Sequence, residues 1–263
     1  MTTPHVAAPR QTPPANPLFE YVLRIADDRL VLGHRLSEWC GHGPILEEDI
    51  ALSNIALDFI GQASAMLALA GQIEGQGRTE DTLAYFRDEH EFRNALLVEQ
   101  PNGDFAVTIV RQFLFDAWSV LVLDALQGVK HPQLAALAAK SLKEDRYHLR
   151  HSSEWMLRLG DGTAESHARA QRALDDLWRF TGELFETDAI DAAVAADGIA
   201  VDHASIRARW QEIVADVARR ATLTLPGDAP MATGGRRGRH SEHLGHMLAE
   251  MQIVARSHPG ASW

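Results

Sequence analysis

Apolar residues recur at helical spacing along nearly the whole chain from Leu18 onward. Stretches rich in glycine and proline interrupt the pattern at 41–44, 75–77, 100–103, 128–132, 160–162 and 225–238. Such stretches end helices, because proline lacks an amide proton and glycine is conformationally free. No segment shows the period-two alternation that is typical of strands. The pattern therefore predicts an all-α protein of about seven or eight helices.

Four of the predicted helices are long and cover residues 18–39, 46–73, 104–127 and 132–159. At 1.5 Å per residue, the second and the fourth would each be about 40 Å long. Four long helices are the minimum for a four-helix bundle. We therefore expect these four to form the core, and the helices after Thr163 to pack outside it.

The domain organisation follows from chain length and from the first residues. A chain of 263 residues can bury a substantial core, so we expect a single domain over 18–263. Residues 1–17 contain five prolines and no apolar stretch. This composition predicts a disordered leader and not a signal peptide.

Composition narrows the possible partners and the compartment. The net charge of −11 argues against binding to nucleic acid, which requires a basic surface. A single cysteine, Cys40, excludes an internal disulfide and a cysteine-rich metal site, and it fits a reducing cytoplasm. The longest apolar stretch, 105–126, contains three charged residues, so we expect a buried helix and no membrane span.

Several polar residues occupy positions where the helical pattern requires apolar ones. Asp116 lies on the apolar stripe of the helix over 104–127, and Asp145 and His148 lie one turn apart on the inward stripe of the helix over 132–159. Glu38 and Asp58 are the corresponding polar positions of the first two helices. A buried charge must be paired, bound to a metal or neutralised, so these residues are candidates for a functional cluster.

The arrangement is similar to that of the di-iron carboxylate bundles, in which two helices supply one Glu each and two supply Glu-x-x-His. In this chain no histidine follows a Glu by three residues, and only His148 follows an acid, Asp145, at that distance. The second helix has no histidine. We expect a vestigial site at Glu38, Asp58, Asp116, Asp145 and His148, held by hydrogen bonds and without bound metal; a single metal ion is the alternative.

Long segments of the chain carry a resemblance to a known family. They are LGHRLSEWCGHGPILEEDIALSNIALDFIGQA at 32–63, DTLAYFRDEHEFRNALLVEQPNGDFA at 81–106, RQFLFDAW at 111–118, KEDRYHLRHS at 143–152, LWRFTGELFE at 177–186 and TGGRRGRHSEHLGHMLAEMQ at 233–252. Over about residues 18–263 the chain resembles the C subunits of the phenylacetyl-CoA 1,2-epoxidases, which are ferritin-like helical proteins of aerobic phenylacetate degradation.

The resemblance implies a structural, non-catalytic subunit without a cofactor of its own. It implies that a related A subunit holds the di-iron centre, that the C subunit pairs with it, and that a small accessory subunit and a reductase with NADPH, FAD and a 2Fe-2S cluster complete the system. It also implies contact with the phenylacetyl-CoA substrate at the interface. We expect this contact at Glu91, Phe92, Arg93 and Asn94, and at the arginine loop with Arg236 and Arg237.

Two other functions are compatible with a bundle of this kind. The chain could be a catalytic di-iron oxygenase in its own right, which requires bound iron. It could be an iron store or a ligand-binding module, for which the sequence offers no intact set of ferroxidase ligands. Iron content and a stable complex with an A-type partner distinguish these hypotheses from the structural role.

Overall fold

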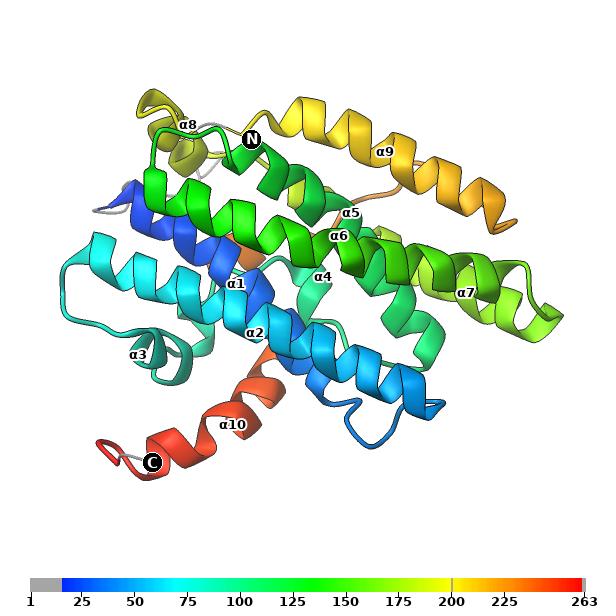
Figure 1. Ribbon diagram of the computed structural model, residues 1–263, viewed down its shortest axis with the longest axis horizontal. Coiled ribbons are helices and arrows are strands. Elements are labelled where there is room, and N and C mark those ends of the chain that lie inside the picture. The colour runs from blue at the N-terminus through cyan, green and yellow to red at the C-terminus, as the bar shows by residue number, and fades with distance from the viewer. Residues whose placement is uncertain (1–15, 200, 262–263) are drawn as a thin grey trace, which may run out of the picture.

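The computed structural model describes residues 16–199 and 201–261, which fold into α-helices and short 3₁₀ helices without any strand (Figure 1). The α-helices are α1 (Pro17–Ser37), α2 (Leu46–Glu74), α3 (Glu80–Tyr85), α4 (Leu96–Glu99), α5 (Phe105–Leu126), α6 (Pro132–Gly160), α7 (Ala164–Trp178), α8 (Ala189–Ala196), α9 (His203–Arg220) and α10 (Glu242–Ser257). The 3₁₀ helices are η1 (Glu89–Glu91), η2 (Gly182–Phe185) and η3 (Gly235–Arg237). The predicted all-α class is confirmed.

The helix count exceeds the predicted seven or eight, because α3, α4 and α8 are only six, four and eight residues long. Such short helices leave too few turns for a periodic apolar pattern. The predicted leader lies outside the described residues, apart from its last two positions. Those two already belong to the start of α1, where Oδ1 of Asn16 accepts a hydrogen bond from the amide of Phe19 and Pro17 is the first helical residue.

The four long helices form the expected bundle. Helix α1 packs along α2, α5 packs along α6, and α2 also contacts α6 (Figure 1). The later helices cover this core, since α7 and α9 lie against α5 and α8 lies against α1. Helix α10 packs on α3 and η1, away from the centre of the bundle. This ferritin-like architecture agrees with the sequence-based prediction.

Close contact between α1 and α2 depends on a glycine. A Cβ atom at position 33 would lie 2.9 Å from Cγ1 of Ile60 and 3.2 Å from the carbonyl oxygen of Ala56. Gly33 therefore lets the two backbones approach one another.

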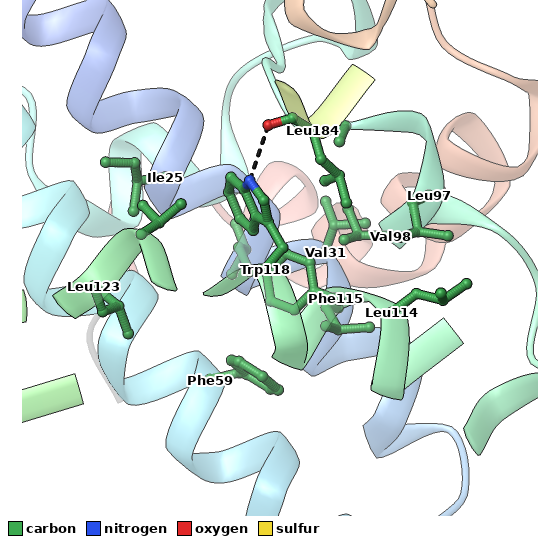
Figure 2. Packing of buried hydrophobic residues seen from close by; sticks show 14 of the residues in the cluster. Ile25, Val31, Phe59, Leu97, Val98, Leu114, Phe115, Trp118, Leu123 and Leu184 are labelled. Carbon is green, nitrogen blue, oxygen red and sulfur yellow. Dashed lines mark hydrogen bonds between the residues drawn. The ribbon is translucent and has the colours of Figure 1, made fainter. Parts of the chain in front are cut away.

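The apolar core is built around α5, whose side chains are buried on nearly all sides. Phe113, Leu114 and Phe115 are fully buried, and Phe59 from α2 meets the Phe115 ring edge-on (Figure 2). The indole nitrogen of Trp118 donates a hydrogen bond of 2.9 Å to the carbonyl oxygen of Leu184, which fastens η2 to the bundle (Figure 2). The core thus joins the long helices and the segments outside them in one unit.

Two helices of the described chain, α2 and α5, are long and apolar enough to span a membrane by length and composition. In α5, 89% of the most apolar window is buried inside the protein, as expected of a core helix. In α2 the corresponding share is 44%. Helix α2 therefore carries apolar side chains that this chain alone does not cover.

Candidate functional site

A buried arginine lies at the centre of the four-helix bundle. The side chain of Arg29, on α1, is fully buried. Its Nε donates 2.9 Å to Oε1 of Gln62 on α2, and one terminal nitrogen donates 2.8 Å to the hydroxyl of Ser119 on α5. The other terminal nitrogen donates 3.1 Å to the carbonyl oxygen of Ile25. All three guanidinium nitrogens therefore have partners inside the core.

Asp145, on α6, supplies the negative charge that faces this guanidinium. Its Oδ2 lies 3.8 Å from Arg29 and accepts a hydrogen bond of 2.6 Å from the Ser119 hydroxyl. Its Oδ1 accepts a hydrogen bond of 2.9 Å from Nε2 of Gln62. Since the carboxylate is fully buried, the arginine and these donors compensate its lost hydration.

His148 lies one turn further along α6 and is also fully buried. Its Nε2 is 3.0 Å from Oδ2 of Asp58, and its Nδ1 is 3.7 Å from Oδ1 of Asp145. Burial lowers the pKa of His148, but the hydrogen bond to Asp58 and the charges of Asp145 and Asp116 outweigh it and raise the pKa above its ordinary value. The cluster thus favours a protonated, positively charged His148 in addition to the charge of Arg29.

Asp116, on α5, is a buried carboxyl group at the edge of the same cluster. Its Oδ1 accepts a hydrogen bond of 2.6 Å from Gln112, and its Oδ2 accepts one of 2.8 Å from Ser152. Burial raises the pKa of Asp116 to about 7, although His148 and the two hydrogen bonds act in the opposite direction. The group therefore changes charge near neutral pH.

Replacing Asp116 by asparagine is expected to make the stability of the protein less dependent on pH. The folded chain keeps a proton on Asp116 that the unfolded chain has already lost, so stability falls as pH rises from about 4 toward 7. Between pH 5 and pH 8 this contribution is about 2–3 kcal/mol, and Asp116→Asn should remove it. Urea unfolding of both proteins at the two pH values measures the effect, and equal losses with pH in both would contradict it.

The structure brings together four of the five residues predicted as a vestigial metal site, namely Asp58, Asp116, Asp145 and His148. It does not place Glu38 with them. Glu38 caps the end of α1 and is exposed, where it pairs with Arg35 and accepts a hydrogen bond from Asn102. The prediction for Glu38 is wrong, because α1 ends at Ser37. The inward stripe of α1 therefore stops before Glu38.

Sequence reasoning missed Arg29, which is the centre of the cluster. A signal was present, because positions 22, 26, 29, 33 and 36 follow one another at helical spacing and all are buried. Arg29 is the only polar residue of this stripe. Arginine is seldom fully buried, so the pattern alone favours a side chain at position 29 that reaches the surface.

The core cluster does not fit a di-iron centre. Such a centre requires four carboxylates and two histidines from four helices. Here α1 and α2 contribute a guanidinium and an amide at the centre, while α5 contributes a hydroxyl. Within residues 16–199 and 201–261, no group of three or more His, Cys, Asp or Glu side chains is arranged to hold a metal ion.

A second set of buried charges ties the segments around Arg87, Ala95 and Arg236 to α1. Asp28 is fully buried and pairs with Arg236 at 2.8 Å, and it accepts a hydrogen bond of 2.7 Å from the amide of Ala95. Its neighbour Asp27 pairs with Arg87 at 2.5 Å. Buried pairs of this kind hold the loop segments in place, since breaking one leaves an uncompensated charge.

This set of charges changes the interpretation of the residues expected to contact CoA. Phe92 and Asn94 are fully buried, and Arg236 points inward to Asp28 with a side chain 11% exposed. Their burial indicates a structural role for these three positions and argues against them as substrate contacts. The arginine loop is fixed, because the carboxylate of Glu183 accepts hydrogen bonds from the amides of Gly234 and Arg236.

The other three candidate CoA contacts are partly exposed. Arg93 pairs with Glu20 at 3.2 Å, and Arg237 pairs with Glu186 at 3.3 Å. Glu91 accepts a hydrogen bond of 2.7 Å from the amide of Asp88 and closes the capping box of η1. The side chains lie near the surface, but each already has a partner within the chain.

The outward face of α2 carries large apolar side chains and is open. Leu46, Ile50 and Leu57 are 71%, 52% and 67% exposed. At about 100° per residue they lie within roughly 40° of one another around the helix axis, so they share one face. Gly61 and Ser64, both exposed, continue it without bulky side chains. We call these five residues the α2 face; an exposed surface with neighbouring large apolar side chains is typical of an interface.

Comparison with known proteins places the chain in a family. A relative from Escherichia coli (strain K12), named as the C subunit of 1,2-phenylacetyl-CoA epoxidase, is 52% identical over 248 residues, which cover 94% of this chain and 100% of the relative. The family model described as phenylacetic acid catabolic protein matches residues 1–263. The chain therefore belongs to the phenylacetic acid catabolic protein family, as its sequence segments and its ferritin-like fold indicate.

Proposed function

We propose that this chain is the structural, non-catalytic C subunit of a phenylacetyl-CoA epoxidase. One observation carries the proposal: a guanidinium, that of Arg29, occupies the centre of the bundle, where a catalytic chain of this fold would hold iron. The family membership and the name of the E. coli relative support the rest. A chain without iron cannot activate O₂ by the chemistry of the di-iron carboxylate proteins.

The division of labour in the complex follows from this role. The catalytic A subunit holds the di-iron centre, and a reductase supplies electrons from NADPH through FAD and a 2Fe-2S cluster. A small accessory subunit belongs to the same cytoplasmic assembly. This chain binds none of these cofactors and supports the A subunit by pairing with it. Phenylacetyl-CoA lies at the interface, where Arg93, Arg237 and Glu91 are the accessible candidates for contact.

The α2 face is the surface that we assign to the catalytic partner. Helix α2 is held to α6 on another side, because Asp58 of α2 bonds to His148 of α6 and Gln62 bonds to Glu144, so the α2 face stays open. Tyr147 on α6 is also a large, exposed side chain, at 52%. The small residues of the α2 face allow a partner helix to approach closely, and its leucine and isoleucine side chains bury on contact.

Iron analysis of the purified chain, alone and coexpressed with its A subunit, tests the proposed function. We expect no iron in the chain alone, and iron only in a stable complex that copurifies. Turnover of phenylacetyl-CoA should need the A subunit. About two iron atoms per chain in the protein alone, with turnover on addition of reductase, would make the chain a catalyst and refute the proposal.

A further inference from the structure

A cleft on the outside of the bundle is formed by α7, η2, α9 and the loop 225–231. Its volume of about 440 Å³ is within the range of small-molecule sites. Three aromatic side chains line it, and the Trp210 ring packs on both others, with its centroid 5.6 Å from that of Trp178 and 5.2 Å from that of Phe185. Trp178 and Phe185 are half-buried, so the cleft has an open aromatic surface.

The walls of this cleft are held in place by the chain itself. Just before the loop, the amide of Thr224 donates a hydrogen bond of 2.9 Å to the side chain of Gln171 on α7. Just after it, the amide of Ala232 donates one of 2.8 Å to the carbonyl oxygen of Arg179. The indole nitrogen of Trp210 donates 3.0 Å to a carbonyl oxygen of α5. The cleft is therefore preformed, and a ligand would not have to order its walls.

Two side chains of opposite charge line the same cleft. Arg207, on α9, has its guanidinium carbon 5.9 Å from the centroid of the Phe185 ring, and Asp228 belongs to the loop. Among the residues that the structure describes, neither has an ion-pair partner, and they do not pair with each other, whereas Arg219 of the same helix pairs with Asp216. The cleft thus combines an aromatic surface with a cation and an anion whose charges are not compensated within the described chain.

We propose that this cleft binds a free aromatic amino acid. The ring of the ligand packs on Trp178 and Phe185, its carboxylate pairs with Arg207, and its ammonium group pairs with Asp228. A zwitterion is favoured over an aromatic compound with one charge, because a single charge would leave one of the two side chains unpaired and facing a group of its own sign. The inference goes beyond the proposed function and does not rest on it, since it requires neither the A subunit nor phenylacetyl-CoA.

Isothermal titration calorimetry of the full-length chain with L-phenylalanine tests the inference, and we expect saturable binding with one molecule per chain. Phenylacetate lacks the ammonium group and 2-phenylethylamine lacks the carboxylate, so each should bind about 5-fold more weakly, the effect of one exposed ion pair. L-Alanine lacks the ring and should bind at least about 10-fold more weakly. Heat without saturation, or phenylacetate binding as tightly as L-phenylalanine, would overturn the inference.

Three substitutions locate the site. Arg207→Gln and Asp228→Asn each change an exposed side chain, so both should keep the native melting temperature and weaken L-phenylalanine binding by about 5-fold. In Asp228→Asn, phenylacetate should bind as tightly as L-phenylalanine, because the ammonium group has lost its partner. The matched control is Arg209→Gln, which changes an exposed arginine of α9 that does not line the cleft, and it should bind like the native chain. Unchanged affinity in both cleft variants, or an equal loss in the control, would place the ligand elsewhere and overturn the inference.

Discussion

Replacing Arg236 by methionine is expected to lower the free energy of unfolding by about 3–5 kcal/mol, because it leaves a buried carboxylate without its cation. Asp28, the partner, is fully buried, and burial raises its pKa against the opposing effect of Arg236. The same guanidinium also donates to the carbonyl oxygens of Arg24 and Arg93. Its loss should therefore loosen the contacts among α1, the segment around Arg93 and the arginine loop. Urea unfolding followed by circular dichroism measures the change.

The neighbouring arginine provides the matched control. Arg237 and its partner Glu186 are 30% and 33% exposed, so solvent screens their attraction. Arg237→Met should cost less than about 1 kcal/mol. Adding Asp28→Asn to Arg236→Met should recover much of the lost stability, since no buried charge then remains. If Arg236→Met kept native stability and lost only affinity for CoA, Arg236 would be a substrate contact, as its sequence context indicates.

The fold was predictable from the sequence to the level of its four long helices. Their apolar stripes are continuous over five turns or more, and breakers such as Gly128 to Pro132 separate them clearly. The short helices α3 and α4 were not predictable in this way, because their positions depend on contacts with distant residues. For example, the amide of Leu96 at the start of α4 donates to Glu183, 87 positions away.

The candidate site was predictable only where neighbouring residues on one helix define it. Asp145 and His148 are found from their spacing, and Asp116 from its apolar surroundings. The ion pair of Asp28 with Arg236 joins positions 208 apart, and no periodicity reveals such a pair. The sequence therefore predicts a contact with CoA at the arginine loop, whereas in the structure Arg236 neutralises the buried Asp28.

Replacing Leu57 by arginine is expected to weaken the complex with the catalytic subunit by roughly 30-fold or more, the effect of losing about 2 kcal/mol at a central interface residue. Leu57 is 67% exposed in this chain, so the substitution should leave the fold intact. A charge on the α2 face would have to be buried without a partner when the two subunits meet. Copurification of tagged A subunit with each variant, and a dissociation constant from titration, measure the effect.

A matched substitution on another helix shows whether the loss of affinity is specific to the α2 face or follows from any loss of exposed apolar surface. Ile253 on α10 is 59% exposed and lies on a helix that packs on α3 and η1. Ile253→Arg adds the same charge to a similarly exposed position, and it should leave the dissociation constant unchanged if α2 provides the contact. Weakening by Ile253→Arg alone would place the catalytic partner on the α10 side of the bundle, and equal weakening by both would mean that the effect of Leu57→Arg is not specific to the α2 face. Unchanged melting temperatures in both variants are required for either conclusion, because only then does the difference in affinity report on the surface.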